Sequence, residues 1–113
     1  MTLAHPLPDP LVVRIAERFR ILGEPMRIRL LDRLRDGEAS VHELTVALGA
    51  TQQNVSKHLG LLHAAGVVSR RREGTRVLYT IADESVFDLC ETVCGGLRRQ
   101  VGDLDDLLAG AVR

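Results

Sequence analysis

A helix start at Ser40 constrains the fold more than any other feature of the sequence, because it fixes the position of two successive helices. Ser40 is followed three residues later by Glu43, the pattern of a capping box in which side chain and backbone cap each other. Gly49 tolerates the left-handed backbone that often ends a helix, and Thr51 can cap the next one. The sequence therefore predicts helices over residues 41–48 and from Thr51 to about Ala64 or Ala65, the layout of a helix-turn-helix.

Patterns on either side of this helix pair predict the remaining elements. Apolar residues recur at helical spacing over residues 11–22 and 26–35, and a last helix is expected from Asp83 to about Val101. Two β-prone runs, Val67–Arg72 and Arg76–Ile81, are joined by a Glu-Gly-Thr connection of hairpin length. The fold class is therefore mostly α with a small β-hairpin wing, a winged helix-turn-helix.

The 113 residues are expected to form one domain with an arm before it and a tail after it. Residues 1–10 are proline-rich and predicted to be a flexible N-terminal arm, with Asp9 or a neighbour starting the first helix. Residues 11–101 are predicted to be the folded domain and residues 102–113 a C-terminal tail. Leu104, Leu107 and Leu108 place a short last turn or helix in that tail. Hydrophobic residues make up 45% of the chain but aromatic residues only 3%, which favours helices packed through aliphatic faces over a large β-sandwich.

Charge is distributed unevenly along a chain whose formal net charge is zero. Residues 51–82 contain five basic residues against Glu73 alone, whereas residues 83–113 contain seven acidic residues against three arginines. Because salt screens each charge beyond about 8 Å, a basic stripe on a neutral protein can still engage phosphates. The net charge therefore does not exclude a nucleic-acid partner.

The second helix of the pair and the hairpin carry the predicted contacts with double-stranded DNA. A polar first turn alone is usually a solvated helix start, but here a capped short helix precedes it and an arginine-rich hairpin follows. Val55, Leu59, Leu61 and Leu62 are expected to hold the helix against the core. The predicted DNA-binding residues are Thr51, Gln52, Gln53, Ser56, Lys57 and His58 on the helix and Arg70, Arg71, Arg72 and Arg76 on the hairpin.

Several of these segments together resemble the ArsR/SmtB family of transcriptional repressors over roughly residues 11–95. The segments are Leu22–Leu31, with the pattern L-x-x-P-x-R-x-x-I/L-L, then Gln53–Leu59, Leu62, Ala65–Val68 and Arg72–Tyr79. The resemblance implies a homodimer joined through the first and last helices. It also implies a repressor that binds an inverted repeat in an operator and leaves the DNA when an effector arrives.

The effector is not indicated by the metal-binding positions known in that family. Where thiolate-sensing members carry Cys-x-Cys, this chain has Ser40 and His42, and serine is a poor ligand for soft metals. Where zinc-sensing members begin the last helix with Asp and a His two residues on, it has Asp83 and Ser85. Neither set of ligands is present in the sequence.

Cys90 and Cys94 are the candidate effector residues that remain. Their spacing places two sulfur atoms on one helix face, and a twofold dimer could bring four thiols together. Such thiolates could bind a thiophilic ion such as As(III), Cd(II) or Hg(II), or react with oxidants or reactive sulfur species. Two alternatives stay open: the cysteines fill the core, or the protein is an effector-independent or organic-ligand regulator.

Other function classes have less support. The sequence contains no Gly-rich phosphate loop, nucleophile elbow or His-Glu-x-x-His pair, so we do not expect an enzyme. No apolar run is long enough to span a membrane and no signal-peptide pattern is seen, which predicts a cytoplasmic protein without a membrane partner. The alternative from a different class is a helical protein-interaction module that does not bind DNA.

Overall fold

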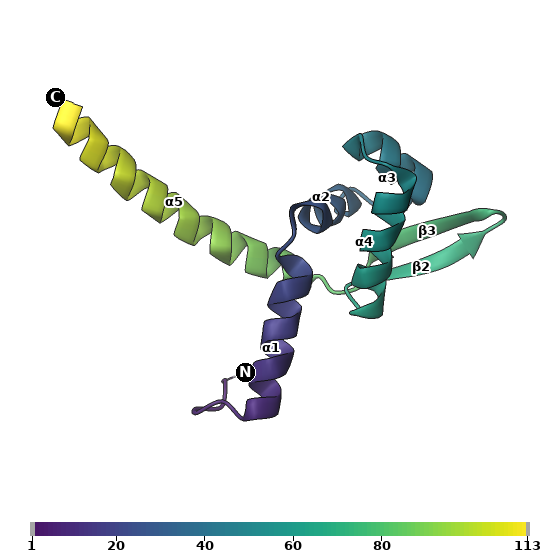
Figure 1. The fold of residues 1–113 in the computed structure, drawn as a ribbon, viewed down its shortest axis with the longest axis horizontal. Coiled ribbons are helices and arrows are strands. Elements are labelled where there is room, and N and C mark those ends of the chain that lie inside the picture. Colours follow the sequence, from purple (N-terminus) through teal and green to yellow (C-terminus); the bar gives the residue numbers. More distant parts are fainter. Residues whose placement is uncertain (1, 113) are drawn as a thin grey trace. The chain divides into compact units, whose positions relative to one another are not determined.

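The computed structural model describes residues 2–112, apart from the side chains of residues 103–105 and 110–112, and divides into two compact units. The first unit ends at Ala82 and contains every element but the last, and the second begins at Asp83 and contains one long helix. The first unit consists of α1 (Asp9–Leu22), α2 (Pro25–Leu34), β1 (Ala39–Ser40), α3 (Val41–Leu48), α4 (Gln52–Ala64), β2 (Val68–Glu73) and β3 (Arg76–Ile81) (Figure 1). The predicted fold class, mostly helical with a β-hairpin wing, is confirmed.

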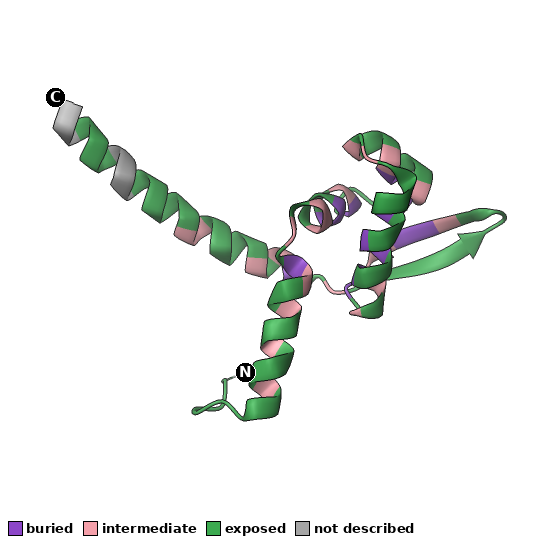
Figure 2. Ribbon diagram, in the orientation of Figure 1, coloured by how far each residue is buried: buried purple, intermediate pink, exposed green. Residues whose placement is uncertain are grey.

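The strands form a three-stranded antiparallel sheet in the order β1-β3-β2. The hairpin of β2 and β3 turns at Gly74, whose φ of +63° lies in the left-handed region that glycine adopts without strain. Strand β1 was not predicted; its two residues, Ala39 and Ser40, pair with Tyr79 and Leu78 of β3. The hairpin extends beyond the helices and is exposed over most of β2 (Figures 1 and 2).

The two predicted caps of the helix-turn-helix are confirmed. Ser40 Oγ accepts a hydrogen bond from the backbone N–H of Glu43, and Glu43 Oε1 accepts one from the N–H of Ser40, both at 3.1 Å. Thr51 Oγ1 caps α4 by accepting from the N–H of Asn54 at 3.2 Å. Between the helices, Gly49 adopts φ +61° at the end of α3. The local hydrogen bonds of Ser40 and Thr51 thus fix where each helix begins, and Gly49 marks where α3 ends.

The core of the first unit lies where α2, α3 and α4 meet the base of the sheet (Figure 2). Most of its leucines come from three successive helices, and the three strands contribute the other buried apolar residues. The buried apolar residues of these elements are Leu30, Leu31, Leu34, Ala39, Leu44, Val55, Leu59, Leu62, Val68, Leu78 and Tyr79. Burying aliphatic surface of this kind is the main stabilising contribution in a small domain.

The predicted start of the first helix agrees with the structure, whereas the predicted end of the last helix does not. Helix α1 begins at Asp9, inside the segment 1–10 predicted as an arm, and has a proline in its first turn. Helix α5 (Ser85–Val112) does not end near Val101 but continues through the segment predicted as a tail. Gly102 and Gly110 are the residues there with the lowest helix propensity, and isolated glycines cost too little to end a long helix. No helix in the described part of the chain is long and apolar enough to cross a membrane.

Gly60 is an exposed helix-interior glycine in α4, which makes it a site for stabilisation. A β-carbon built there meets nothing within 4 Å, so Gly60→Ala should raise the free energy of unfolding by about 0.5–1 kcal/mol. Gly49→Ala is the matched control, because an alanine at φ +61° is strained and should destabilise by about 1 kcal/mol. Urea denaturation measures the free energy of unfolding of both variants. If Gly60→Ala is less stable than wild type, the helix needs the flexibility of glycine at that position.

Candidate DNA-binding surface

Helix α4 presents a polar face to solvent and an apolar face to the core. Thr51, Gln52, Gln53, Ser56 and Lys57, all predicted to contact DNA, are exposed. The opposite face carries Val55, Leu59 and Leu62, which are completely buried. The exposed polar groups are therefore held on the outer side of a helix that is anchored by its other side.

Two residues of α4 differ from expectation. Leu61, expected in the core, is 38% exposed, whereas His58, expected at the DNA, is only 7% exposed. Buried positions in α4 follow the spacing 55, 58, 59 and 62, one face of a helix, and residue 61 falls outside it. His58 is therefore a core residue rather than a surface group available to DNA.

Arg27 of α2 joins His58 to the end of α1. Its guanidinium lies 3.0 Å from His58 Nδ1 and donates to the carbonyl oxygen of Ile21 at 2.6 Å. Arginine is a donor only, so His58 Nδ1 is the acceptor in this contact. Glu24, 3.8 Å from the same nitrogen, caps α2 by accepting from the Arg27 backbone N–H. This partly buried polar cluster joins α4 to the first two helices of the fold.

Two of the four wing arginines are held by carboxylates. Arg71 donates two hydrogen bonds to Glu38, at 2.7 and 2.6 Å, and lies 2.8 Å from Glu73. Arg76 donates to Glu43 Oε1 at 2.6 Å. Each of the bonds to Glu38 and Glu43 spans 33 residues of sequence, so neither was apparent from local patterns.

The other two wing arginines have no such partner. Arg70 and Arg72 are exposed, and among the side chains described by the structure no carboxylate pairs with either of them. The four arginines predicted to contact DNA thus form two groups, Arg70 and Arg72 unpaired and Arg71 and Arg76 paired.

The carboxylates that hold the wing stay charged at neutral pH. Hydrogen bonding from Arg71 lowers the pKa of Glu38 below its usual value, and the backbone and side chain of Ser40, followed by Arg76, lower the pKa of Glu43. The same contacts, with Glu38 first and Glu73 second, raise the pKa of Arg71. Both partners of each ion pair are therefore charged at neutral pH.

The candidate thiols lie on α5 and are exposed. Cys90 and Cys94 are both free thiols on this helix, and neither is in a disulfide. They stand one helical turn apart, and no cluster of three or more His, Cys, Asp and Glu residues occurs among the described side chains. One chain therefore offers a soft metal ion two sulfur ligands at most in this region.

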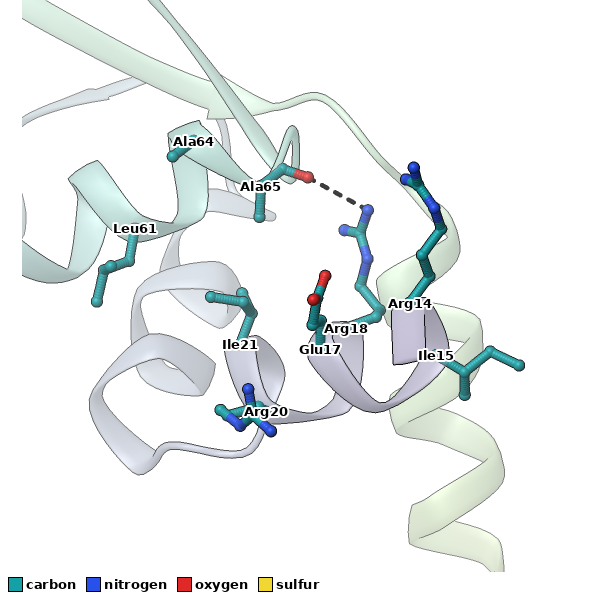
Figure 3. Close-up of a pocket in the computed structure, with 9 residues that line it drawn as sticks. All are labelled: Arg14, Ile15, Glu17, Arg18, Arg20, Ile21, Leu61, Ala64 and Ala65. Carbon is teal, nitrogen blue, oxygen red and sulfur yellow. Dashed lines mark hydrogen bonds between the residues drawn. The ribbon is translucent and has the colours of Figure 1, made fainter. Parts of the chain in front are cut away.

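A groove of about 730 Å³ lies between α1 and the end of α4 (Figure 3). Arg14, Arg18, Arg20 and Glu17 line it from α1, and Arg18 donates to the carbonyl oxygen of Ala65 at 3.2 Å. The rest of the lining is apolar and consists of Ile15, Ile21, Leu61, Ala64 and Ala65. Sequence patterns did not indicate this groove, because it forms between segments more than 40 residues apart.

Comparison with known proteins places this architecture in a family. Residues 24–70 match the family model described as bacterial regulatory protein, arsR family. The chain is 38% identical over 107 residues to Rv0081 of Mycobacterium tuberculosis, an uncharacterized helix-turn-helix-type transcriptional regulator. The alignment covers 90% of this chain and 94% of that protein. The chain belongs to the ArsR family. The crystal structure of Rv0081 superposes with a TM-score of 0.75 over 85% of this chain and 97% of that one, at 37% identity.

Two further relatives extend the comparison. The homodimeric winged helix-turn-helix DNA-binding domain of Mb0332 from Mycobacterium bovis superposes with a TM-score of 0.70 at 32% identity, over 84% of this chain and 91% of that one. A probable mercury resistance operon repressor of Streptomyces lividans is 39% identical over 74 residues, covering 66% of this chain and 59% of that protein. This ArsR-family member is thus a DNA-binding transcriptional regulator and not an enzyme, as the sequence predicted.

Proposed function

We propose that the protein is a cytoplasmic, homodimeric repressor that binds an inverted-repeat operator and releases it when an effector binds. The first two turns of α4 would enter the major groove, with Thr51, Gln52, Gln53, Ser56 and Lys57 facing bases and phosphates, and the wing would meet the backbone beside it. The observation that carries this proposal is the polar outer face of α4 next to a hairpin with four arginines. His58 is left out because it is buried.

Selection from a pool of random-sequence DNA duplexes tests the proposal and identifies the operator sequence in the same experiment. The full-length protein should enrich one sequence with two related halves whose centres lie about 34–36 Å apart or a multiple of that spacing. Its affinity for the enriched duplex, measured by fluorescence anisotropy, should fall steeply with salt as phosphate contacts release counterions. Absence of enrichment and of salt-dependent binding would favour the protein-interaction module instead.

Gln53 and Lys57 should have separable effects on DNA binding. Gln53→Ala should change the preference among bases, because an amide can pair with a base edge. Lys57→Ala should weaken binding to all sequences alike and reduce the salt slope by about 1, as expected for a phosphate contact. Anisotropy titrations on the selected duplex and its single-base variants measure both, and a Gln53→Ala variant with unaltered preference would remove that residue from base recognition.

A homodimer is supported by apolar side chains left exposed on α1 and on α5. In α1 these are Val12, Val13 and Phe19, and in α5 they are Val93, Leu97 and Val101. Large apolar side chains exposed in a row are typical of surfaces that bind another protein. Sedimentation equilibrium should give twice the chain mass at micromolar concentration, whereas a monomer at that concentration would contradict the proposal.

We propose Cys90 and Cys94 as the effector site, with a thiophilic metal or metalloid ion or reactive sulfur species as effector. Two exposed thiols one turn apart suit soft ions, which prefer thiolate ligands, and a second chain could add two more. The similarity to a mercury resistance repressor makes Hg(II) the first ion to test, followed by As(III), Cd(II) and sulfane sulfur. Release of wild-type protein from DNA by one of these, with a Cys90→Ser/Cys94→Ser variant that stays bound, is the expected result.

An organic effector is the second candidate, and the groove between α1 and α4 favours it. Its volume of about 730 Å³ is within the usual range for small-molecule sites, and its arginines would attract an anion. If the cysteine double variant releases DNA in the same way as wild type, the thiol proposal is wrong. Arg14→Ala, in the groove, would then be the variant to compare with wild type in the same titration.

A further inference from the structure

The wing carries its arginines on both faces of the hairpin. Directly opposed residues of an antiparallel pair point to the same face, so Arg71 with Leu78 and Glu73 with Arg76 share one face. Arg70 with Tyr79 and Arg72 with Val77 share the other. Because side chains alternate along a strand, the paired and unpaired arginines of β2 are separated by geometry as well as by ion pairing.

The carboxylates that meet Arg71 and Arg76 belong to the start of the helix-turn-helix. Glu38 lies directly before β1, and Glu43 lies in the first turn of α3. Glu43 Oε1 accepts both from the Ser40 backbone N–H at 3.1 Å and from Arg76 at 2.6 Å. One oxygen atom therefore joins the cap of α3 to the wing.

We propose that Glu38 and Glu43 are positioning residues that set the angle of the wing through Arg71 and Arg76, leaving Arg70 and Arg72 to contact the phosphates. This inference rests on the proposed function and divides its four wing arginines into two roles. Arg71 and Arg76 are already neutralised by carboxylates, so each would release fewer counterions on binding DNA than an unpaired arginine.

Orientation, rather than stability, is the role that such contacts support. The paired side chains remain 30–53% exposed, and ion pairs at this exposure contribute little to the free energy of unfolding. The geometry is nonetheless specific, because Arg71 binds Glu38 through two parallel hydrogen bonds. Variants at these four positions should therefore fold, while the hairpin loses its fixed direction.

Amide hydrogen exchange of the free full-length protein tests the positioning role without DNA. Glu38→Gln and Glu43→Gln should speed exchange in the hairpin around Glu73 to Arg76, because the wing is no longer held at its outer half. Glu43→Gln keeps an oxygen that can cap α3, so its effect reports the lost ion pair. Arg70→Gln and Arg72→Gln are the matched controls and should leave exchange unchanged; equal exchange in all four variants would overturn the proposal.

The salt dependence of binding to the selected duplex tests the division of roles. Arg70→Gln and Arg72→Gln should each lower the slope of log K against log salt by about 0.9, the loss of one phosphate contact. Arg71→Gln, Arg76→Gln, Glu38→Gln and Glu43→Gln should weaken binding several-fold with the wild-type slope. The Glu38→Gln/Arg71→Gln double variant should bind no more weakly than either single variant, because both remove the same contact.

The opposite results have distinct meanings. A slope lowered by Arg71→Gln or Arg76→Gln, or tighter binding by Glu38→Gln, would show that these arginines contact phosphate and that their carboxylates compete with DNA. That outcome overturns the inference and leaves the repressor proposal intact. If wild-type protein shows no salt-dependent binding, the repressor proposal fails, and hydrogen exchange still decides whether Glu38 and Glu43 hold the wing.

Discussion

Leu59→Ala is expected to lower the free energy of unfolding by about 2–5 kcal/mol, because Leu59 is completely buried in the face of α4 that meets the core. Removing its isobutyl group forfeits apolar burial and leaves a cavity that the neighbouring helices fill only partly. Urea denaturation measures the loss, at one fixed protein concentration because dimerisation couples stability to concentration.

Leu61→Ala is the matched control, since it removes the same atoms from the same helix at a position that is 38% exposed. Its cost should be below about 1.5 kcal/mol, because most of the lost surface was already in water. Equal losses for the two variants would mean that Leu61 is covered in solution, for example by a second chain.

Arg27→Ala is the second change expected to have a large effect, on both stability and DNA binding. It leaves the carbonyl oxygen of Ile21 and the ring nitrogen of His58 without their donor, at a cost of about 1–3 kcal/mol. Because His58 belongs to α4, we also expect affinity for the selected duplex to fall about tenfold, equivalent to about 1.4 kcal/mol. Urea denaturation and fluorescence anisotropy measure the two effects.

Arg29→Ala separates this contribution from the general loss of a positive charge in α2. Arg29 is exposed on the same helix, so its removal should leave both stability and affinity close to wild type. Arg27→Lys should recover only part of the loss, because an ammonium group lacks the planar fork that reaches two acceptors. If Arg27→Ala binds DNA as wild type does, the cluster of Arg27, Glu24 and His58 stabilises the fold without orienting α4.

The elements that the sequence predicted well are those with local causes. The Ser40–Glu43 capping box, the left-handed Gly49 and the Thr51 cap each depend on residues within about three positions of one another, and all three are observed. Strand β1 could not be found in the same way. Its two residues form a strand through pairing with β3, almost 40 positions later.

The exposed polar residues of the candidate DNA-binding surface were predictable from the sequence, but the hydrogen-bond and ion-pair partners of its side chains were not. Residue types and helix caps predicted that Gln53 and Lys57 would be exposed, and they are. The burial of His58 follows helical periodicity, but a histidine at a buried position needs a polar partner, and Arg27 is 31 residues away. The carboxylates that bind Arg71 and Arg76 could not be predicted for a similar reason, because each lies 33 residues from its arginine in the sequence. The distribution of charge along the chain indicated a basic wing, but it did not indicate which of the wing arginines form ion pairs with carboxylates.

Ser40 belongs to two elements at once, and this restricts where the chain can change length. It pairs with Leu78 as the last residue of β1 and caps α3 as the residue before its first turn. A residue inserted after it would separate the strand pair from the helix cap, so one of the two would be lost. The Gly74 turn at the wing tip has no comparable double role and lies in exposed backbone. The fold should therefore tolerate an inserted residue better at the Gly74 turn than after Ser40, because exposed turns usually accept extra residues.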